Sequence, residues 1–195
     1  MNLTVKGKQI DIGDALREHV HSNISSICNK YFIDPIEASV TFSREAYLIK
    51  VQISVHIGKG ILLQAEDNAD LPYPAFDLAV QHLIKRLQKY KKRLKDHQRK
   101  SVDSFAVQHY VLAPEPDLEE HHDQNNISHP TIVAEMETDI ATLTVSEAVM
   151  RLDLADLNAM MFRNRSHGGL NMVYRRLDGH IGWIDPQNKE LLNQK

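Results

Sequence analysis

One long amphipathic helix between Phe76 and Lys100 constrains this chain most. Its apolar residues recur at steps of three and four, so they share one side of the helix. These residues are Phe76, Val80, Leu83, Leu87, Tyr90 and Leu94. The opposite side is basic and carries Lys85, Lys89, Lys92 and Arg99, flanked by Arg86, Arg93 and Lys100. One side of the helix is therefore suited to packing on a core, while the other presents charge of one sign.

Two explanations fit this basic side. Many surface helices are simply solvated by lysine, and such a helix needs no charged partner. Soluble helices, however, tend to pair Glu with Lys at four-residue spacing, and no Glu occurs between Phe76 and Lys100. The one-signed charge therefore favours a phosphate-backbone partner.

The charge of the chain divides between its two halves. The sequence has 195 residues and a formal net charge of −3. Residues 1–100 contain sixteen Lys and Arg against eleven Asp and Glu, whereas residues 101–195 contain seven against fifteen. We infer two units with different tasks, the first of which faces an anion.

The cellular location is predicted from what the sequence lacks. Cys28 is the single cysteine, so an intramolecular disulfide is excluded and a reducing cytosol fits. The first residues form no signal-peptide pattern, and no segment approaches the length of a membrane span. We expect a cytoplasmic protein with no membrane partner.

The first hundred residues predict an α+β domain with the order β-α-β-β-β-α. Apolar alternation places strands near residues 3–5, 36–42, 47–57 and 61–65, and a helical period runs from Ile12 to Tyr31. An antiparallel sheet with both helices on one face would bury both apolar stripes. Lys6, Lys8 and Lys30 extend the basic surface if they lie on the helix side, which the sequence does not settle.

Residues 101–129 are predicted to form an acidic flexible linker. They contain no Lys or Arg and include turn-forming Pro and Asn residues. The segment FAVQHYVL, residues 105–112, is too apolar for linker alone, and whether it docks is left open. The acidic residues could also screen the basic helix, an idea that rests on sign alone.

Residues 130–195 are predicted to form a small β-α-β-β-β domain. Thr144 and Glu147 have the spacing of a capping box at a helix start, and Asp178–Gly179 fits a hairpin turn. The later strands place apolar residues on both faces, so one helix cannot cover them all. A second copy of the chain is the economical cover, although the N-terminal domain or residues 105–112 are alternatives.

Catalytic and metal-binding signatures are absent from the sequence. The histidines lack metal-ligand spacing, and neither a dinucleotide-binding glycine pattern, a P-loop nor a nucleophile elbow occurs. We therefore expect no enzyme activity, no metal, no cofactor and no small-molecule substrate.

Two stretches carry a resemblance to a known family. The first runs from Ala69 to Asp77 and continues into Lys85–Arg86–Leu87 and Lys89–Tyr90–Lys91. The second, more specific stretch combines residues 146–150 with residues 171–186, which read NMVYRRLDGHIGWIDP. Together they resemble long-form ribosome hibernation promoting factors, the ribosome-associated inhibitor or sigma-factor modulation family.

The resemblance implies a function and a set of site residues. It implies an N-terminal domain similar to double-stranded-RNA-binding folds, which binds the small ribosomal subunit in the mRNA and tRNA channel and inhibits translation. It also implies that paired C-terminal domains join two ribosomes. The rRNA-binding candidates are Lys85, Arg86, Lys89, Lys92, Arg93, Lys95, Arg99, Lys100, Lys6, Lys8 and Lys30. The dimerisation candidates are Met160, Phe162, Met172, Val173, Tyr174, Ile181 and Trp183.

Three alternative functions remain at this point. One is a free RNA-binding regulator of mRNA or small RNA. Another is an adaptor whose acidic half binds a protein partner. The third is an enzyme whose site leaves no sequence signature.

Overall fold

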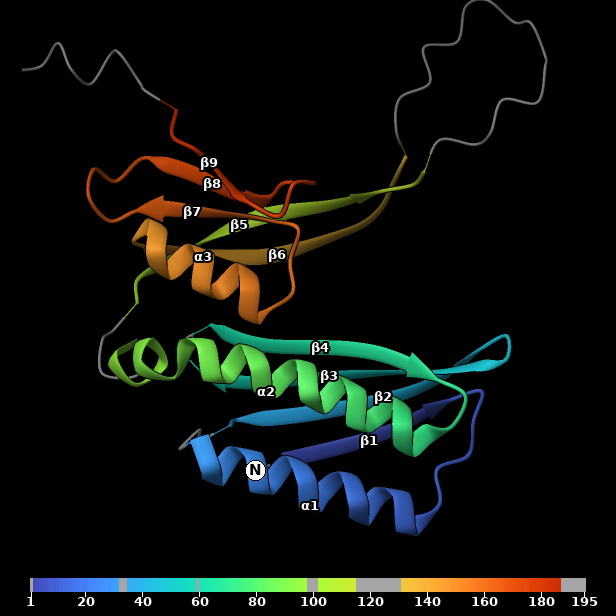
Figure 1. The fold of residues 1–195 in the computed structure, drawn as a ribbon. Helices are drawn as coiled ribbons and strands as arrows, with labels where there is room; N and C mark the ends of the chain where they lie inside the picture. The colour runs from blue at the N-terminus through green and yellow to red at the C-terminus, as the bar shows by residue number, and fades with distance from the viewer. Residues whose placement is uncertain (1, 32–34, 59, 98–101, 115–130, 187–195) are drawn as a thin grey trace, which may run out of the picture.

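The computed structural model describes residues 2–31, 35–58, 60–97, 102–114 and 131–186, which form two β-sheets and three helices (Figure 1). The chain is α+β, as predicted. The N-terminal elements are β1 (Asn2–Lys8), α1 (Asp14–Tyr31), β2 (Glu37–Glu45), β3 (Leu48–Gly58), β4 (Ile61–Ala69) and α2 (Pro72–His97). The C-terminal elements are β5 (Ser104–Leu112), β6 (Ile132–Leu143), α3 (Val145–Leu154), β7 (Ala159–Asn164), β8 (Leu170–Arg175) and β9 (Ile181–Ile184).

The N-terminal sheet has the strand order β1-β2-β3-β4, with α1 and α2 on one face (Figure 1). β2, β3 and β4 are antiparallel neighbours, but β1 runs parallel to β2, so the prediction of a fully antiparallel sheet was wrong. The reason is α1, which connects β1 to β2 as a crossover, and such a connection joins parallel strands. The sheet remains one layer with both helices on the same side.

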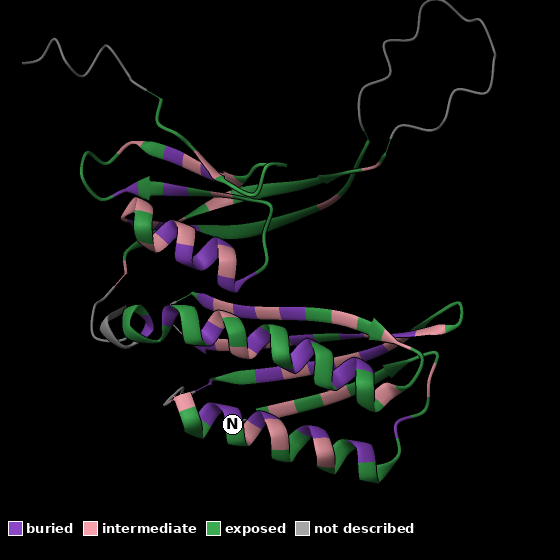
Figure 2. Cartoon of the chain, in the orientation of Figure 1, coloured by how far each residue is buried: buried purple, intermediate pink, exposed green. Residues whose placement is uncertain are grey.

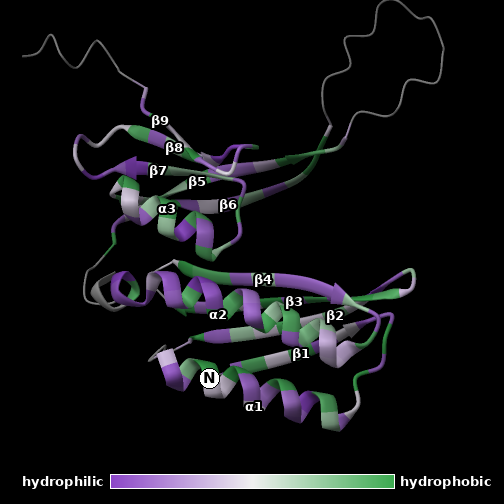
Figure 3. Ribbon diagram, viewed as in Figure 1, coloured by the Kyte–Doolittle hydropathy of each residue, from purple (hydrophilic) through white to green (hydrophobic). Residues whose placement is uncertain are grey.

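The core of this domain lies between the sheet and the two helices. Val40 and Phe42 on β2 and Val51 on β3 are completely buried, while the residues that alternate with them are polar. The apolar stripes of both helices pack against these strands. Along α1 and α2, buried residues therefore alternate with exposed ones in Figure 2, and hydrophobic residues with hydrophilic ones in Figure 3. α2 begins at Pro72, four residues before the predicted start, because proline is tolerated in a first turn whose N–H groups lack helical partners.

The C-terminal sheet has the order β5-β6-β7-β8-β9. α3 connects β6 to β7, which are parallel neighbours. Thr144 caps α3, and both reciprocal hydrogen bonds of the predicted capping box are present. Gly179, with φ of 83°, occupies the predicted turn between β8 and β9.

Residues 104–112 form strand β5, so the flexible linker predicted over 101–129 does not hold for this part. β5 pairs with β6 along its length, from Ser104 opposite Ala141 to Leu112 opposite Ile132. β5 is rich in aromatic and β-branched residues, which favour strands, and it lies at the edge of the sheet. Residues 115–129 of the predicted linker lie outside the described residues.

Helix α3 is the element that the two sheets share. One of its sides packs on the C-terminal sheet through Ala148 and Leu152, while Met150 and Leu154 on the other side belong to the N-terminal core. Figure 1 shows α3 between the C-terminal sheet and the layer of α2 and β4. A helix that is apolar on both sides is buried on both sides, and α3 therefore joins the two domains.

Candidate nucleic-acid interface

The solvent side of α2 is a cationic surface. Lys85, Lys92 and Arg93 are exposed, and none of them forms an ion pair with any described residue. The opposite side of the helix is anchored by Phe76, Leu83 and other residues of the predicted apolar stripe, all of them buried. Because the buried side fixes the rotation of the helix, these cations are held outward and are available to an anion.

Lys30 extends this surface from the neighbouring helix. The ammonium group of Lys30 lies 5.9 Å from the ring centroid of Tyr31, and Lys91 of α2 lies 5.7 Å from the same ring. The two lysines therefore meet where the C-terminal ends of α1 and α2 adjoin. Lys91 was not among the predicted site residues, although it belongs to the same basic run.

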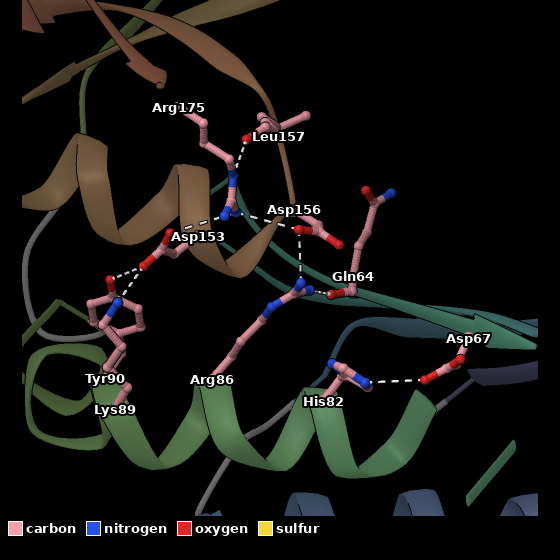
Figure 4. Close-up of polar contacts among 10 residues, drawn as sticks. All are labelled: Gln64, Asp67, His82, Arg86, Lys89, Tyr90, Asp153, Asp156, Leu157 and Arg175. Carbon is pink, nitrogen blue, oxygen red and sulfur yellow. Dashed lines mark hydrogen bonds and ion pairs between the residues drawn. The ribbon is translucent and has the colours of Figure 1, made fainter. Parts of the chain in front are cut away.

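Arg86 and Lys89 point toward the C-terminal domain (Figure 4). Nη2 of Arg86 lies 2.7 Å from Oδ1 of Asp156, and Arg86 also donates to the Gln64 carbonyl on β4. Nζ of Lys89 lies 2.6 Å from Oδ2 of Asp153, which also accepts a hydrogen bond from Tyr90. These two cations have carboxylate partners in the C-terminal domain, whereas Lys85 and Lys92 have none among the described residues.

The contact at Asp153 shifts three pKa values. Burial alone would raise the pKa of Asp153, but the hydrogen bonds from Lys89 and Tyr90 outweigh it and lower that pKa. The hydrogen bond to Asp153 raises the pKa of Lys89, and burial together with the same carboxylate raises the pKa of Tyr90. Each shift favours the protonation states that hold the contact near neutral pH.

The remaining rRNA-binding candidates lie elsewhere. Lys6 and Lys8 are exposed on β1, and Lys6 lines a hollow with Ser39 and His56 on the sheet face opposite the helices. The structure therefore does not bring Lys6 together with the cations of α2. Lys95 belongs to α2, but its side chain lies outside the described residues, as do Arg99 and Lys100.

The dimerisation candidates divide between the two faces of the C-terminal sheet. Phe162 and Val173 are completely buried beneath α3, and Met160 and Ile181 pack against the same core. Nε1 of Trp183 donates to Oδ1 of the buried Asn171, 2.8 Å away. These side chains therefore pack within the C-terminal core of a single chain or form polar contacts at its edge.

Met172 and Tyr174 lie on the opposite face, which α3 does not cover. Met161 is paired with Met172 there and is 50% exposed, and Ile184 on β9 is 46% exposed. The Tyr174 ring lies across Gly182, where an added Cβ would come within 2.3 Å of it. Met161 was missed because it alternates with Phe162 in a strand that is apolar on both faces.

Two family profiles match this chain. The profile described as Sigma 54 modulation protein / S30EA ribosomal protein matches residues 3–95, and that of the C terminus of the same proteins matches residues 128–182. A ribosome hibernation promotion factor from Bradyrhizobium diazoefficiens is 34% identical over 95% of this chain and 95% of its own length. One from Rhizobium meliloti is 36% identical over 96% of this chain and 98% of its own.

The chain belongs to the long-form ribosome hibernation promoting factor family. A ribosome hibernation promotion factor from Bacillus subtilis is also similar, at 25% identity over 95% of this chain and 99% of that protein. Among solved structures, a ribosomal subunit interface protein from Coxiella burnetii covers 47% of this chain and 98% of its own, at 25% identity and a TM-score of 0.40. Membership in this family connects the chain to ribosome hibernation.

Each family profile covers most of one sheet. The first profile runs from β1 into α2, and the second begins after β5 and runs from before β6 into β9. β5 is thus an edge strand that the C-terminal profile does not include. The basic helix α2 lies within the first profile, and the uncovered face of β7 and β8 lies within the second.

In the part of the chain that the structure describes, no group of three or more metal-ligating side chains occurs, and none of the helices is long and apolar enough to span a membrane. Cys28 is buried in the N-terminal core, and burial raises the pKa of its thiol.

Proposed function

We propose that this chain binds the small ribosomal subunit in the mRNA and tRNA channel and inhibits translation there without catalysis. α2 would lie against the rRNA backbone, and C-terminal domains of two chains would pair and join two ribosomes. The family supports ribosome hibernation, and a cytoplasmic location is part of this proposal because ribosomes are its target. The cationic surface of α2 supports the contact with rRNA, and the uncovered face of the C-terminal sheet supports the pairing of two chains.

The observation that carries the ribosome contact is the one-signed surface of α2. Lys85, Lys92 and Arg93 are exposed on a rigid helix whose other side is buried. Lysines on such a helix bind phosphates and release their counterions, which gives affinity without reading a base sequence. This mode of binding suits recognition of one structured rRNA site by its shape.

The uncovered face of the C-terminal sheet supports the pairing. Met161, Met172, Tyr174 and Ile184 form an apolar surface that α3 leaves open. The C-terminal core is small, so burying this face against a second copy would add stability that the isolated domain lacks. We therefore assign pairing to this face and not to Phe162 or Val173, which are buried within one chain.

Cosedimentation with purified small subunits tests the ribosome contact. The full chain should sediment with the subunit, and Lys85→Glu with Lys92→Glu should abolish this binding. Lys6→Glu with Lys8→Glu makes the same change of charge on the opposite sheet face, and its binding should be nearly retained. Equal loss in both double variants would place the open sheet face in the interface.

The same preparation separates the proposal from the two non-enzymatic alternatives. A free RNA-binding regulator would bind isolated duplex RNA about as tightly as it binds small subunits. A protein adaptor would bind neither. Preference for the small subunit over duplex RNA of equal concentration supports the proposed function, and failure of the unmodified chain to cosediment would refute it.

A further inference from the structure

The two domains meet through a polar contact at the end of α3. Asp153 and Asp156 approach α2, where Asp153 accepts from Lys89 and Tyr90 and Asp156 pairs with Arg86 (Figure 4). Two cations of the basic helix thus have carboxylate partners in the same chain. Lys85 and Lys92, on the same helix, have none among the described residues.

An apolar contact fixes the position of this acidic end. Met150 and Leu154 of α3 are completely buried within the N-terminal core. Arg151 reaches the turn between β3 and β4, where its Nη1 atom lies 3.2 Å from the position that a Cβ on Gly60 would occupy. Because residues on both sides of Asp153 are packed, its carboxylate is held against α2.

Arg175 keeps the two acids together. Its Nη2 atom lies 3.5 Å from Oδ1 of Asp153 and 3.3 Å from Oδ1 of Asp156. Arg175 belongs to β8, so it would stay with these carboxylates if the C-terminal domain left α2. Separation of the domains would therefore not leave either carboxylate without a charged partner, which lowers the cost of opening.

We infer that the acidic end of α3 is an intramolecular cover for α2, in which Asp153 and Asp156 occupy the cations that rRNA phosphates would otherwise contact. This inference rests on the proposed function, because it assigns α2 to rRNA. Carboxylate and phosphate oxygens compete for the same N–H donors of Arg86 and Lys89. In the closed arrangement the chain binds rRNA weakly, and tight binding requires the C-terminal domain to move away from α2, which also exposes Met150 and Leu154 of α3.

The competition has a measurable size. When only an open fraction of a protein binds its ligand, the apparent dissociation constant is the intrinsic constant divided by that fraction. Two partly exposed ion pairs bias such an equilibrium by roughly 2- to 30-fold. Removing both acids should therefore strengthen binding to the small subunit by a factor within that range.

Lysine acylation followed by mass spectrometry tests whether the closed arrangement exists, without any ribosome. Lys89 should react more slowly than Lys85 and Lys92 in the full chain, because its amine is held protonated by Asp153. Asp153→Asn with Asp156→Asn should increase the acylation rate of Lys89 and leave the acylation rate of Lys85 unchanged. Glu135→Gln with Glu137→Gln is the matched control, because it removes two exposed acids of β6 that form no ion pair with any described residue.

Binding to purified small subunits tests the competition. The Asp153→Asn, Asp156→Asn chain should bind small subunits more tightly than the unmodified chain. Its gain in affinity should exceed the gain of the Glu135→Gln, Glu137→Gln control. Equal Lys89 and Lys85 reactivity in the unmodified chain would overturn the inference, as would equal affinities of the two double variants. If no chain bound small subunits while Lys89 remained protected, the proposed function would fail and the cover of α2 would have no rRNA to exclude.

A thermal melt of each variant shows whether it is folded. Asp153→Asn alone serves if the double variant unfolds, since it removes the carboxylate that both Lys89 and Tyr90 contact. Faster acylation of Lys89 in a folded single variant supports the inference, and unchanged acylation contradicts it.

Discussion

Neutralising two lysines of α2 should change the salt dependence of ribosome binding in a calculable way. Lys85→Gln with Lys92→Gln removes two exposed cations while α2 keeps its buried anchor. Each phosphate contact contributes about 0.7 to 0.9 to the slope of log affinity against log salt concentration. The double variant should therefore lose about 1.4 to 1.8 from the magnitude of that slope.

The same contacts set the loss of affinity at a given salt concentration. Extrapolated from a reference near 1 M salt, two lost contacts weaken binding by about 25- to 60-fold at about 0.1 M salt. Titration of labelled chain with small subunits between about 0.05 and 0.3 M salt measures both quantities. Lys6→Gln with Lys8→Gln is the matched control, and its slope should stay close to that of the unmodified chain.

One result would refute this reasoning. If the Lys85→Gln, Lys92→Gln chain kept the slope of the unmodified chain, those lysines would make no phosphate contact, and α2 would be a solvated helix. If Lys6→Gln with Lys8→Gln lowered the salt-dependence slope by the same amount, the binding would depend on the overall charge of the chain and not on α2.

Three further predictions concern the domain contact and the C-terminal core. The pKa of Asp153 is lowered, so its contact should be complete above the ordinary carboxyl value of 3.8 and lost as pH falls through the folded value; carboxyl-carbon NMR should show that pKa rising in Lys89→Gln. Thr144→Ala should lower the free energy of unfolding of the C-terminal domain by about 1 kcal/mol in a denaturant titration, because it removes the α3 cap. Phe162→Ala should cost about 3–5 kcal/mol in the same titration because Phe162 is fully buried, whereas Met161→Ala should cost far less.

Each of these predictions has a contradicting result. An Asp153 pKa that stayed low in Lys89→Gln would assign the shift to another group. A Thr144→Ala chain of unchanged stability would mean that the cap bonds contribute nothing net. Equal costs at positions 161 and 162 would mean that both faces of β7 are covered alike.

Local patterns predicted most elements because each depends on neighbouring residues. The period of α2 and the alternation along β3 predicted both elements, and the capping box predicted the start of α3. Strand pairing depends on distant partners. The alternation within β1 does not indicate which strand it pairs with, and its parallel pairing with β2 follows only from the helical connection through α1.

The position of β5 shows another limit. Residues 105–112 are apolar apart from Gln108 and His109, but the partner strand β6 lies beyond residues 115–130. An edge strand far from its partner in sequence resembles an apolar segment within a linker. Composition alone therefore favoured a linker from 101 to 129.

The cationic surface of α2 was predictable from the sequence, whereas the uncovered face of the C-terminal sheet was not. The cations of α2 followed from its helical period, because the apolar stripe determines which side faces solvent. In β7, by contrast, Met161 and Phe162 are both apolar, and only the position of α3 shows that Phe162 is covered. The contact of Asp153 with Lys89 joins residues from two domains, and no local pattern indicates such a pair.

Sedimentation of purified ribosomes through a sucrose gradient tests most directly whether α2 holds one ribosome and the C-terminal sheet brings another. The full chain should produce ribosome dimers, and Met161→Glu should leave the chain bound to single ribosomes. Leu177→Glu is the matched control, because it places the same charge at an exposed apolar residue in the turn before β9, and it should still give dimers. Dimers formed by the Met161→Glu chain, or no cosedimentation of the unmodified chain, would contradict this account.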